Sequence, residues 1–114
     1  MAPVMNISGH WYITQDNGYT VDVSMDQDGA SLTAVCSHSN GSVRCDAAAG
    51  TVTGNSFILT IPWNNGTRGE YTGALEAGHF TAANQGILKG HTKDLNNTSS
   101  HCNWEVKDVV FQRA

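Results

Sequence analysis

The sequence has few charged residues and little positive charge. Charged residues make up 14% of its 114 residues, and six lysines and arginines stand against ten aspartates and glutamates, which gives a net charge of −4. The basic residues are scattered singly along the chain, so they form no positive face that could follow the phosphates of a nucleic acid. We therefore expect no nucleic-acid partner.

Long apolar runs and helical periodicity are also missing. No apolar stretch approaches the roughly 18 residues that a membrane-spanning helix needs, so no membrane partner is expected. With 39% hydrophobic residues the chain is nevertheless too apolar to be disordered. Its length is that of one domain, which predicts a single core over residues 1–114.

The sequence is rich in turn-forming pairs, which recur at short intervals: Asn17-Gly18, Asp28-Gly29, Asn40-Gly41, Gly54-Asn55, Asn65-Gly66 and Ala77-Gly78. Between them lie eight segments rich in β-branched and aromatic residues, namely 7–16, 19–27, 30–39, 42–53, 56–63, 69–76, 79–92 and 102–112. The pattern predicts an all-β fold, an eight-stranded antiparallel up-and-down meander barrel. The polar segment 94–100 is expected to be a loop.

The apolar pattern predicts the register of the first hairpin. A three-residue loop at 16–18, with the last residue left-handed, pairs Ile13 with Val21 and Trp11 with Val23. This register keeps all four side chains on one face of the sheet, whereas a two-residue turn would place Trp11 and Ile13 on the wet face. We therefore expect the three-residue loop.

The same apolar face should continue through the next two hairpins. A two-residue turn after the second strand places Met25 opposite Leu32, and another after the third strand extends the inner face to Ala47 and Ala49. The alternation must then slip by one residue before the fifth strand. A β-bulge is therefore expected near residues 48–50.

Two of the three cysteines lie symmetrically about the turn at 40–41. Counting outward from this turn along both strands predicts that Cys36 and Cys45 are a non-hydrogen-bonded antiparallel pair. The Cα atoms of such pairs lie about 4.5 Å apart, which is within the reach of a disulfide. The sequence therefore predicts a Cys36–Cys45 disulfide. Cys102 is left over as a free buried thiol, an intermolecular link or a competitor for either partner.

The expected location follows from these cysteines. Residues 1–5 lack the basic and then apolar pattern of a signal peptide, so either the chain is cytosolic or a signal has been removed. A disulfide implies an oxidising compartment and favours the second alternative. We therefore expect a secreted or extracytoplasmic protein.

No motif assigns catalytic or metal-ligating residues. The histidines show neither His-x-His nor helical spacing, so a metal site would have to be assembled across strands; they are His10, His38, His79, His91 and His101. The sequence names no metal and no cofactor. The carboxylates mostly fall on the wet face, except Asp108, which alternation in the last strand points inward.

Three segments resemble the avidin and streptavidin family, which is related to the lipocalins within the calycins. They are the Gly-x-Trp strand start at 9–11, the apolar strand 58–63 that ends in Trp63, and the late tryptophan Trp104. The resemblance implies an eight-stranded barrel that holds one small ligand, with Trp63 and Trp104 lining its site. It does not imply biotin, because Ile13 stands where the family has an asparagine that recognises the ureido group.

The predicted inner face alternates bulky and small side chains, which leaves room inside the barrel. Aromatic walls with a few polar tips suit a flat or amphipathic molecule, or a sugar. We therefore expect a non-enzymatic module that holds a small-molecule or carbohydrate ligand at one end of the barrel, as a lectin does. The candidate ligand-binding residues are Tyr19, His38, Trp63, Tyr71, Trp104 and Asp108.

Two other functions stay open. The protein could be an inhibitor or interaction module that presents the loop 94–100 to a protein partner. It could also be a small barrel enzyme that templates a reactive substrate, with His38, Tyr71 and Asp108 as the groups to suspect. The sequence shows no nucleophile with its base, so the enzyme ranks third. The apolar residues expected on the outer face, which would suit a homo-oligomer, are Ile58, Leu88 and Val109.

Overall fold

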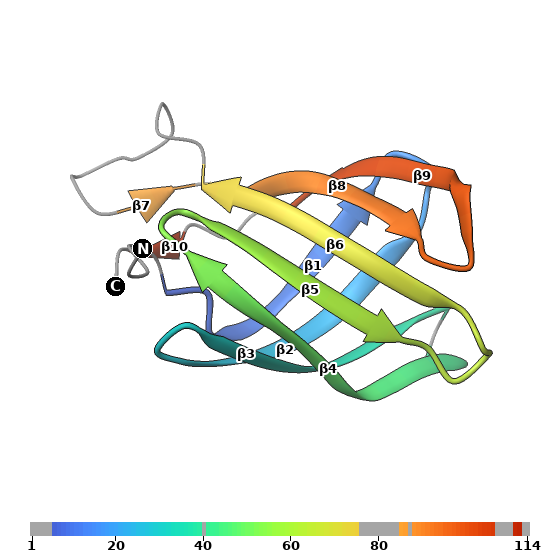
Figure 1. The fold of residues 1–114 in the computed structure, drawn as a ribbon, viewed down its shortest axis with the longest axis horizontal. Helices are drawn as coiled ribbons and strands as arrows, with labels where there is room; N and C mark the ends of the chain where they lie inside the picture. Colours follow the sequence, from blue (N-terminus) through green and yellow to red (C-terminus); the bar gives the residue numbers. More distant parts are fainter. Residues whose placement is uncertain (1–5, 40, 76–84, 87, 107–110, 113–114) are drawn as a thin grey trace.

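The computed structural model describes residues 6–39, 41–75, 85–86, 88–106 and 111–112. Its strands are β1 (Gly9–Gln15), β2 (Thr20–Asp28), β3 (Ser31–His38), β4 (Val43–Thr53), β5 (Ser56–Pro62), β6 (Arg68–Leu75), β7 (Gln85–Gly86), β8 (Leu88–Asp94), β9 (Asn97–Glu105) and β10 (Phe111–Gln112). Eight of them close an antiparallel barrel in the order β1-β2-β3-β4-β5-β6-β8-β9, and β7 pairs with β10 in a separate small sheet (Figure 1). The predicted eight-stranded meander barrel is confirmed.

The segment 94–100, which we predicted as a loop, is mostly strand. β8 runs to Asp94 and β9 begins at Asn97, so only Leu95 and Asn96 form the turn. The Asp94 carboxylate accepts a hydrogen bond from the Asn96 amide (2.8 Å), which holds this tight turn. The prediction failed because outward-facing strand residues are as polar as loop residues. The described residues also contain no helix that could cross a membrane.

The first hairpin has the predicted register. Ile13 pairs with Val21 and Trp11 pairs with Val23. Gly18 has a φ of 94°, the left-handed conformation that the three-residue loop requires. Its amide donates to the Gln15 carbonyl (3.2 Å) and closes the loop.

The second hairpin turns one residue later than predicted. Gly29 and Ala30 form the turn, and Met25 faces Ala34 rather than Leu32. The register has slid by two residues. Because side chains alternate with a period of two, the same residues still face the core.

The β-bulge in β4 lies earlier than residues 48–50. The register against β3 shifts between Cys45 and Ala48, which leaves one extra residue in β4. Ala48 is therefore buried, with 1% of its surface exposed. Ala47 and Ala49, which we predicted to face the core, are exposed instead.

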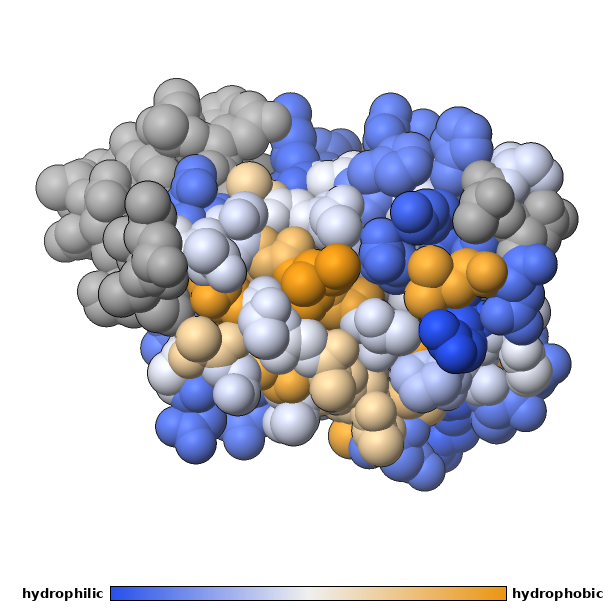
Figure 2. Space-filling view, viewed as in Figure 1, coloured by the Kyte–Doolittle hydropathy of each residue, from blue (hydrophilic) through white to orange (hydrophobic). Residues whose placement is uncertain are grey.

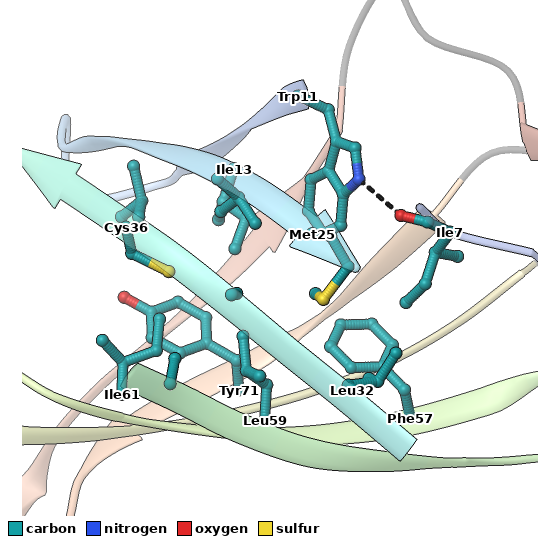
Figure 3. Close-up of a cluster of buried hydrophobic side chains, with 14 of the residues drawn as sticks. Ile7, Trp11, Ile13, Met25, Leu32, Cys36, Phe57, Leu59, Ile61 and Tyr71 are labelled. Atoms are coloured by element: carbon teal, nitrogen blue, oxygen red, sulfur yellow. Dashed lines mark hydrogen bonds between the residues drawn. The ribbon is translucent and has the colours of Figure 1, made fainter. Parts of the chain in front are cut away.

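Apolar side chains fill one end of the barrel. The site described below lies at the opposite end. Ile7 is fully buried, and its carbonyl accepts a hydrogen bond from Trp11 Nε1 (2.9 Å), as Figure 3 shows. Met25 and Phe57 are buried in the same apolar cluster. Among the residues that the structure describes, this packing fills that end of the barrel.

The outer wall carries a small apolar area. Figure 2 shows it in the middle of the face that β4, β5 and β6 present, bordered by polar residues. Ile58 is 39% exposed, as predicted for an outward residue, but Leu88 is fully buried. Leu88 points inward because it begins the alternation of inward side chains that continues along β8. Val109 lies outside the described residues.

Candidate functional site

The hairpins β1–β2, β3–β4, β5–β6 and β8–β9 turn at the same end of the barrel, which we call the mouth (Figure 1). A cavity of about 310 Å³ lies there. Hydrogen bonds join the hairpins around it. Asn96 Nδ2 donates to the Gly66 carbonyl (2.8 Å), and the Asn64 amide donates to the Arg44 carbonyl (2.9 Å). These hydrogen bonds brace the loops against one another.

Three aromatic side chains that we predicted for the site meet on one side of the cavity. Tyr19 follows the first loop, His38 ends β3 and Trp63 follows β5. The ring centroids of Tyr19 and His38 lie 5.6 Å apart at 71°, and those of His38 and Trp63 lie 4.7 Å apart at 82°. These near-perpendicular contacts are favourable for aromatic rings. We call Tyr19, His38 and Trp63 the aromatic trio.

The imidazole of His38 is neutral around pH 7. Burial lowers the pKa of His38 below the usual value for histidine, so its imidazole is uncharged around pH 7. His38 Nδ1 lies 2.9 Å from Ser39 Oγ, which orients the ring. The trio is thus an uncharged aromatic surface.

The floor of the cavity is polar and hydrogen-bonded. Tyr71 is 4% exposed, and its hydroxyl donates to Gln15 Oε1 (2.7 Å). Gln15 Nε2 in turn donates to Asn17 Oδ1 (3.1 Å) and to Cys102 Sγ (3.4 Å). Burial raises the pKa of Tyr71, so the phenol stays protonated and donates. A buried phenol of this kind is not a general base.

Gln15 is a site residue that sequence reasoning missed. It lines the cavity and holds Tyr71 from across the barrel. The signal was present, because Gln15 follows the inward residues Trp11 and Ile13 at a spacing of two. A polar side chain that faces inward at the end of an apolar strand indicates the level at which the core ends and the mouth begins.

A glycine keeps the cavity open between Trp63 and β8. Gly69 pairs with Asp94, and both line the cavity. A Cβ on Gly69 would lie 2.9 Å from Tyr71 Cε1 and 3.5 Å from Trp63 Nε1. Trp63 Nε1 makes no hydrogen bond to any residue that the structure describes. The gap therefore offers an indole donor on one side and a carboxylate acceptor on the other.

Of the other two predicted ligand residues, the structure describes only Trp104. Trp104 is not in the cavity wall but deeper in the core, 3% exposed, with its ring centroid 6.4 Å from that of Tyr71. Its Nε1 has no hydrogen-bond partner among the described residues. Asp108 lies outside the described residues.

The cysteines align as predicted, but the predicted disulfide is not formed in this structure. Cys36 and Cys45 are cross-strand partners, and both are free thiols, as is Cys102. Burial, with smaller contributions from Cys45 and Asp22, raises the pKa of Cys36 to about 12. Cys36 therefore rarely supplies the thiolate that attacks during disulfide formation. Strand pairing predicts which cysteines meet, but not whether they are oxidised.

Of the residues suspected for an enzyme, His38 and Tyr71 line the cavity, but the phenol is held protonated. Among the described residues, no group of three or more histidines, cysteines or carboxylates is placed to hold a metal ion. Neither the models of known protein families nor the curated proteins match this chain.

Proposed function

We propose that the protein is a non-enzymatic module that binds a small molecule or a carbohydrate in the cavity at the barrel mouth. The observation that supports this most strongly is the aromatic trio beside a polar floor in one braced cavity. Its volume of about 310 Å³ lies at the lower end of the range of small-ligand sites. The ligand would therefore be small.

The chemistry of the cavity suits a ring with one apolar face and polar edges. Tyr19 and Trp63 offer aromatic surface to the apolar face. Trp63 Nε1, the Asp94 carboxylate and the amide of Asn65 offer donors and acceptors to the edges. A sugar ring has this combination of an apolar face and outward hydroxyls, as do many small amphipathic metabolites.

The proposal includes the avidin-like affiliation of the barrel, with a ligand other than biotin. The closed eight-stranded barrel and the position of Trp63 at its mouth support the affiliation. Ile13 is fully buried on the inner face of β1. An apolar side chain at this position cannot hydrogen-bond a ureido oxygen, which supports a different ligand.

The test uses two tyrosines with matched exposure. Tyr19, in the trio, is 52% exposed, whereas Tyr12, on the outer face of β1, is 48% exposed and contacts His10 instead. A panel of free mono- and disaccharides and small metabolites would be screened by ligand-observed NMR. Tyr19→Ala should weaken binding of the hits by about tenfold, or ~1.4 kcal/mol, because it removes one stacking surface.

The control is Tyr12→Ala, which should bind as the wild type does, and both variants should keep the wild-type melting temperature because both side chains are half exposed. An empty panel would contradict the proposal. So would a Tyr19→Ala variant that binds every hit with unchanged affinity.

A further inference from the structure

We infer that the outer wall of the barrel carries a zinc site formed by His91 on β8 and His101 on β9. Both side chains are exposed, and their ring centroids lie 5.3 Å apart with 40° between the planes. His91 faces Asn103 across the strands, and His101 faces Lys93. The two imidazoles are therefore diagonal neighbours on one face of the sheet, close enough to share an ion.

The spacing of the rings fits a tetrahedral ion. A zinc–nitrogen bond of about 2.1 Å plus about 1.1 Å to the ring centre places two imidazoles about 5.2 Å apart at the tetrahedral angle. The right angle of a square-planar ion such as Cu²⁺ would bring the ring centres to about 4.5 Å. The observed 5.3 Å is close to the tetrahedral spacing.

His91 is already held as metal ligands usually are. Its Nδ1 lies 3.1 Å from Asn103 Oδ1. An amide oxygen only accepts hydrogen bonds, so Nδ1 carries the proton and Nε2 keeps a free lone pair. Ligating histidines are commonly oriented by such a second contact to an oxygen. Asn103 thus acts as a positioning residue.

The charges around the pair permit a cation. Lys93 lies beside His101, but its ammonium pairs with Glu70 (3.6 Å), which offsets its charge. Lys89 and Glu105 face each other further along the same two strands. Because both histidines are exposed, water can complete the coordination shell. With two protein ligands, we expect a dissociation constant on the order of micromolar.

The test needs no mouth ligand, although His101 also borders the mouth cavity. Zn²⁺ alone would be titrated into the full chain, with its cysteines kept reduced, and followed by calorimetry near neutral pH. One ion should bind per chain, and His91→Ala should weaken binding by at least about tenfold. Asn103→Ala frees the His91 ring but keeps both ligands. Its zinc affinity should therefore lie between those of the wild type and of His91→Ala.

His10→Ala is the matched control. His10 is also an exposed strand histidine, but its Nε2 already contacts Asp22 Oδ1 (2.6 Å), so the variant should bind zinc as the wild type does. Unchanged zinc affinity in His91→Ala would overturn the inference and point to the thiols instead. Absence of zinc binding at roughly millimolar concentration, or His91-dependent binding of Cu²⁺ alone, would overturn it too.

Discussion

Trp104 fits inside the barrel because the two neighbouring strands carry glycine beside it. It pairs with Gly90 on β8, and Gly90 pairs with Gly73 on β6. The indole lies across this gap and reaches Phe57, with ring centroids 5.8 Å apart. A Cβ on Gly73 would lie 2.7 Å from two ring carbons of Trp104. The glycine is therefore needed for space, not for backbone conformation.

Gly73→Ala should destabilise the protein by about 1–3 kcal/mol, the usual effect of overpacking a core. Chemical denaturation would measure the change. Trp104→Phe in the same chain should recover part of the loss, because a smaller ring leaves the new methyl room. Recovery stays partial, since the Lys89 carbonyl would also lie 2.9 Å from that Cβ. If the free-energy changes of the two substitutions simply added, the contact between the new methyl group and the Trp104 ring would not be the cause of the destabilisation.

Single residues next to turns were the most predictable part of the candidate site. Tyr19, His38 and Trp63 each flank a turn that the sequence marks clearly, so strand alternation alone brings them to one mouth. Gln15 and Gly69 were not predicted, because their roles depend on what lies across the barrel. Gln15 matters through Tyr71, which is 56 positions away in the chain.

At the scale of the strand, the sequence predicted which face of the sheet a side chain is on, but not which residue it pairs with across the hairpin. The pairing of β2 with β3 could slide by two residues without exposing any core side chain. The apolar pattern therefore could not distinguish the two registers. The bulge in β4, between Cys45 and Ala48, adjoins a run of three alanines, 47–49. Identical side chains carry no signal about which of them is buried. Only packing of the closed barrel selects Ala48.

The three alanines provide a matched test of the bulge. Ala48→Asp should cost more than about 3 kcal/mol, because it buries a carboxylate without a partner in the core. Ala47→Asp and Ala49→Asp should stay within roughly 1 kcal/mol of the wild type, because both side chains are exposed. Thermal unfolding of the three variants would compare them directly. Severe loss of stability in the Ala47 or Ala49 variant would place the bulge where the sequence alone suggested.

For the whole molecule, the closure of the barrel is uneven. Among the described residues β1 pairs with β9 at two positions, Thr14 with Glu105 and Gln15 with Trp104, whereas every other neighbouring pair of barrel strands has five to seven. A hollow of about 630 Å³, lined by residues of β1, β8 and β9, follows this seam. Gln15 lies in this seam and also in the floor of the mouth cavity. Barrel closure and the shape of the site are thus linked through one side chain.

Gln15→Ala should therefore loosen the seam before it loosens the rest of the barrel. The substitution removes the contacts that tie β1 to Tyr71 and Cys102 and leaves the buried Tyr71 hydroxyl without its acceptor. Hydrogen exchange followed by NMR would compare the Asp16 amide, which bonds to Asn103 across the seam (2.9 Å), with the Val52 amide, which bonds to Ala30 (2.8 Å). Exchange at Asp16 should quicken by about tenfold while exchange at Val52 stays unchanged.

Gln27→Ala is the matched control for this experiment. Gln27 is also a half-buried glutamine at the end of a barrel strand, but its side chain bonds to the Ile7 amide (3.0 Å) and the Gly29 carbonyl (3.1 Å) at the closed end. Its loss should leave exchange at Asp16 as in the wild type. If Gln15→Ala instead quickened exchange equally at Asp16 and Val52, the barrel would open as one unit. The seam would then be no weaker than the other strand pairs, and Gln15 would serve the cavity floor alone.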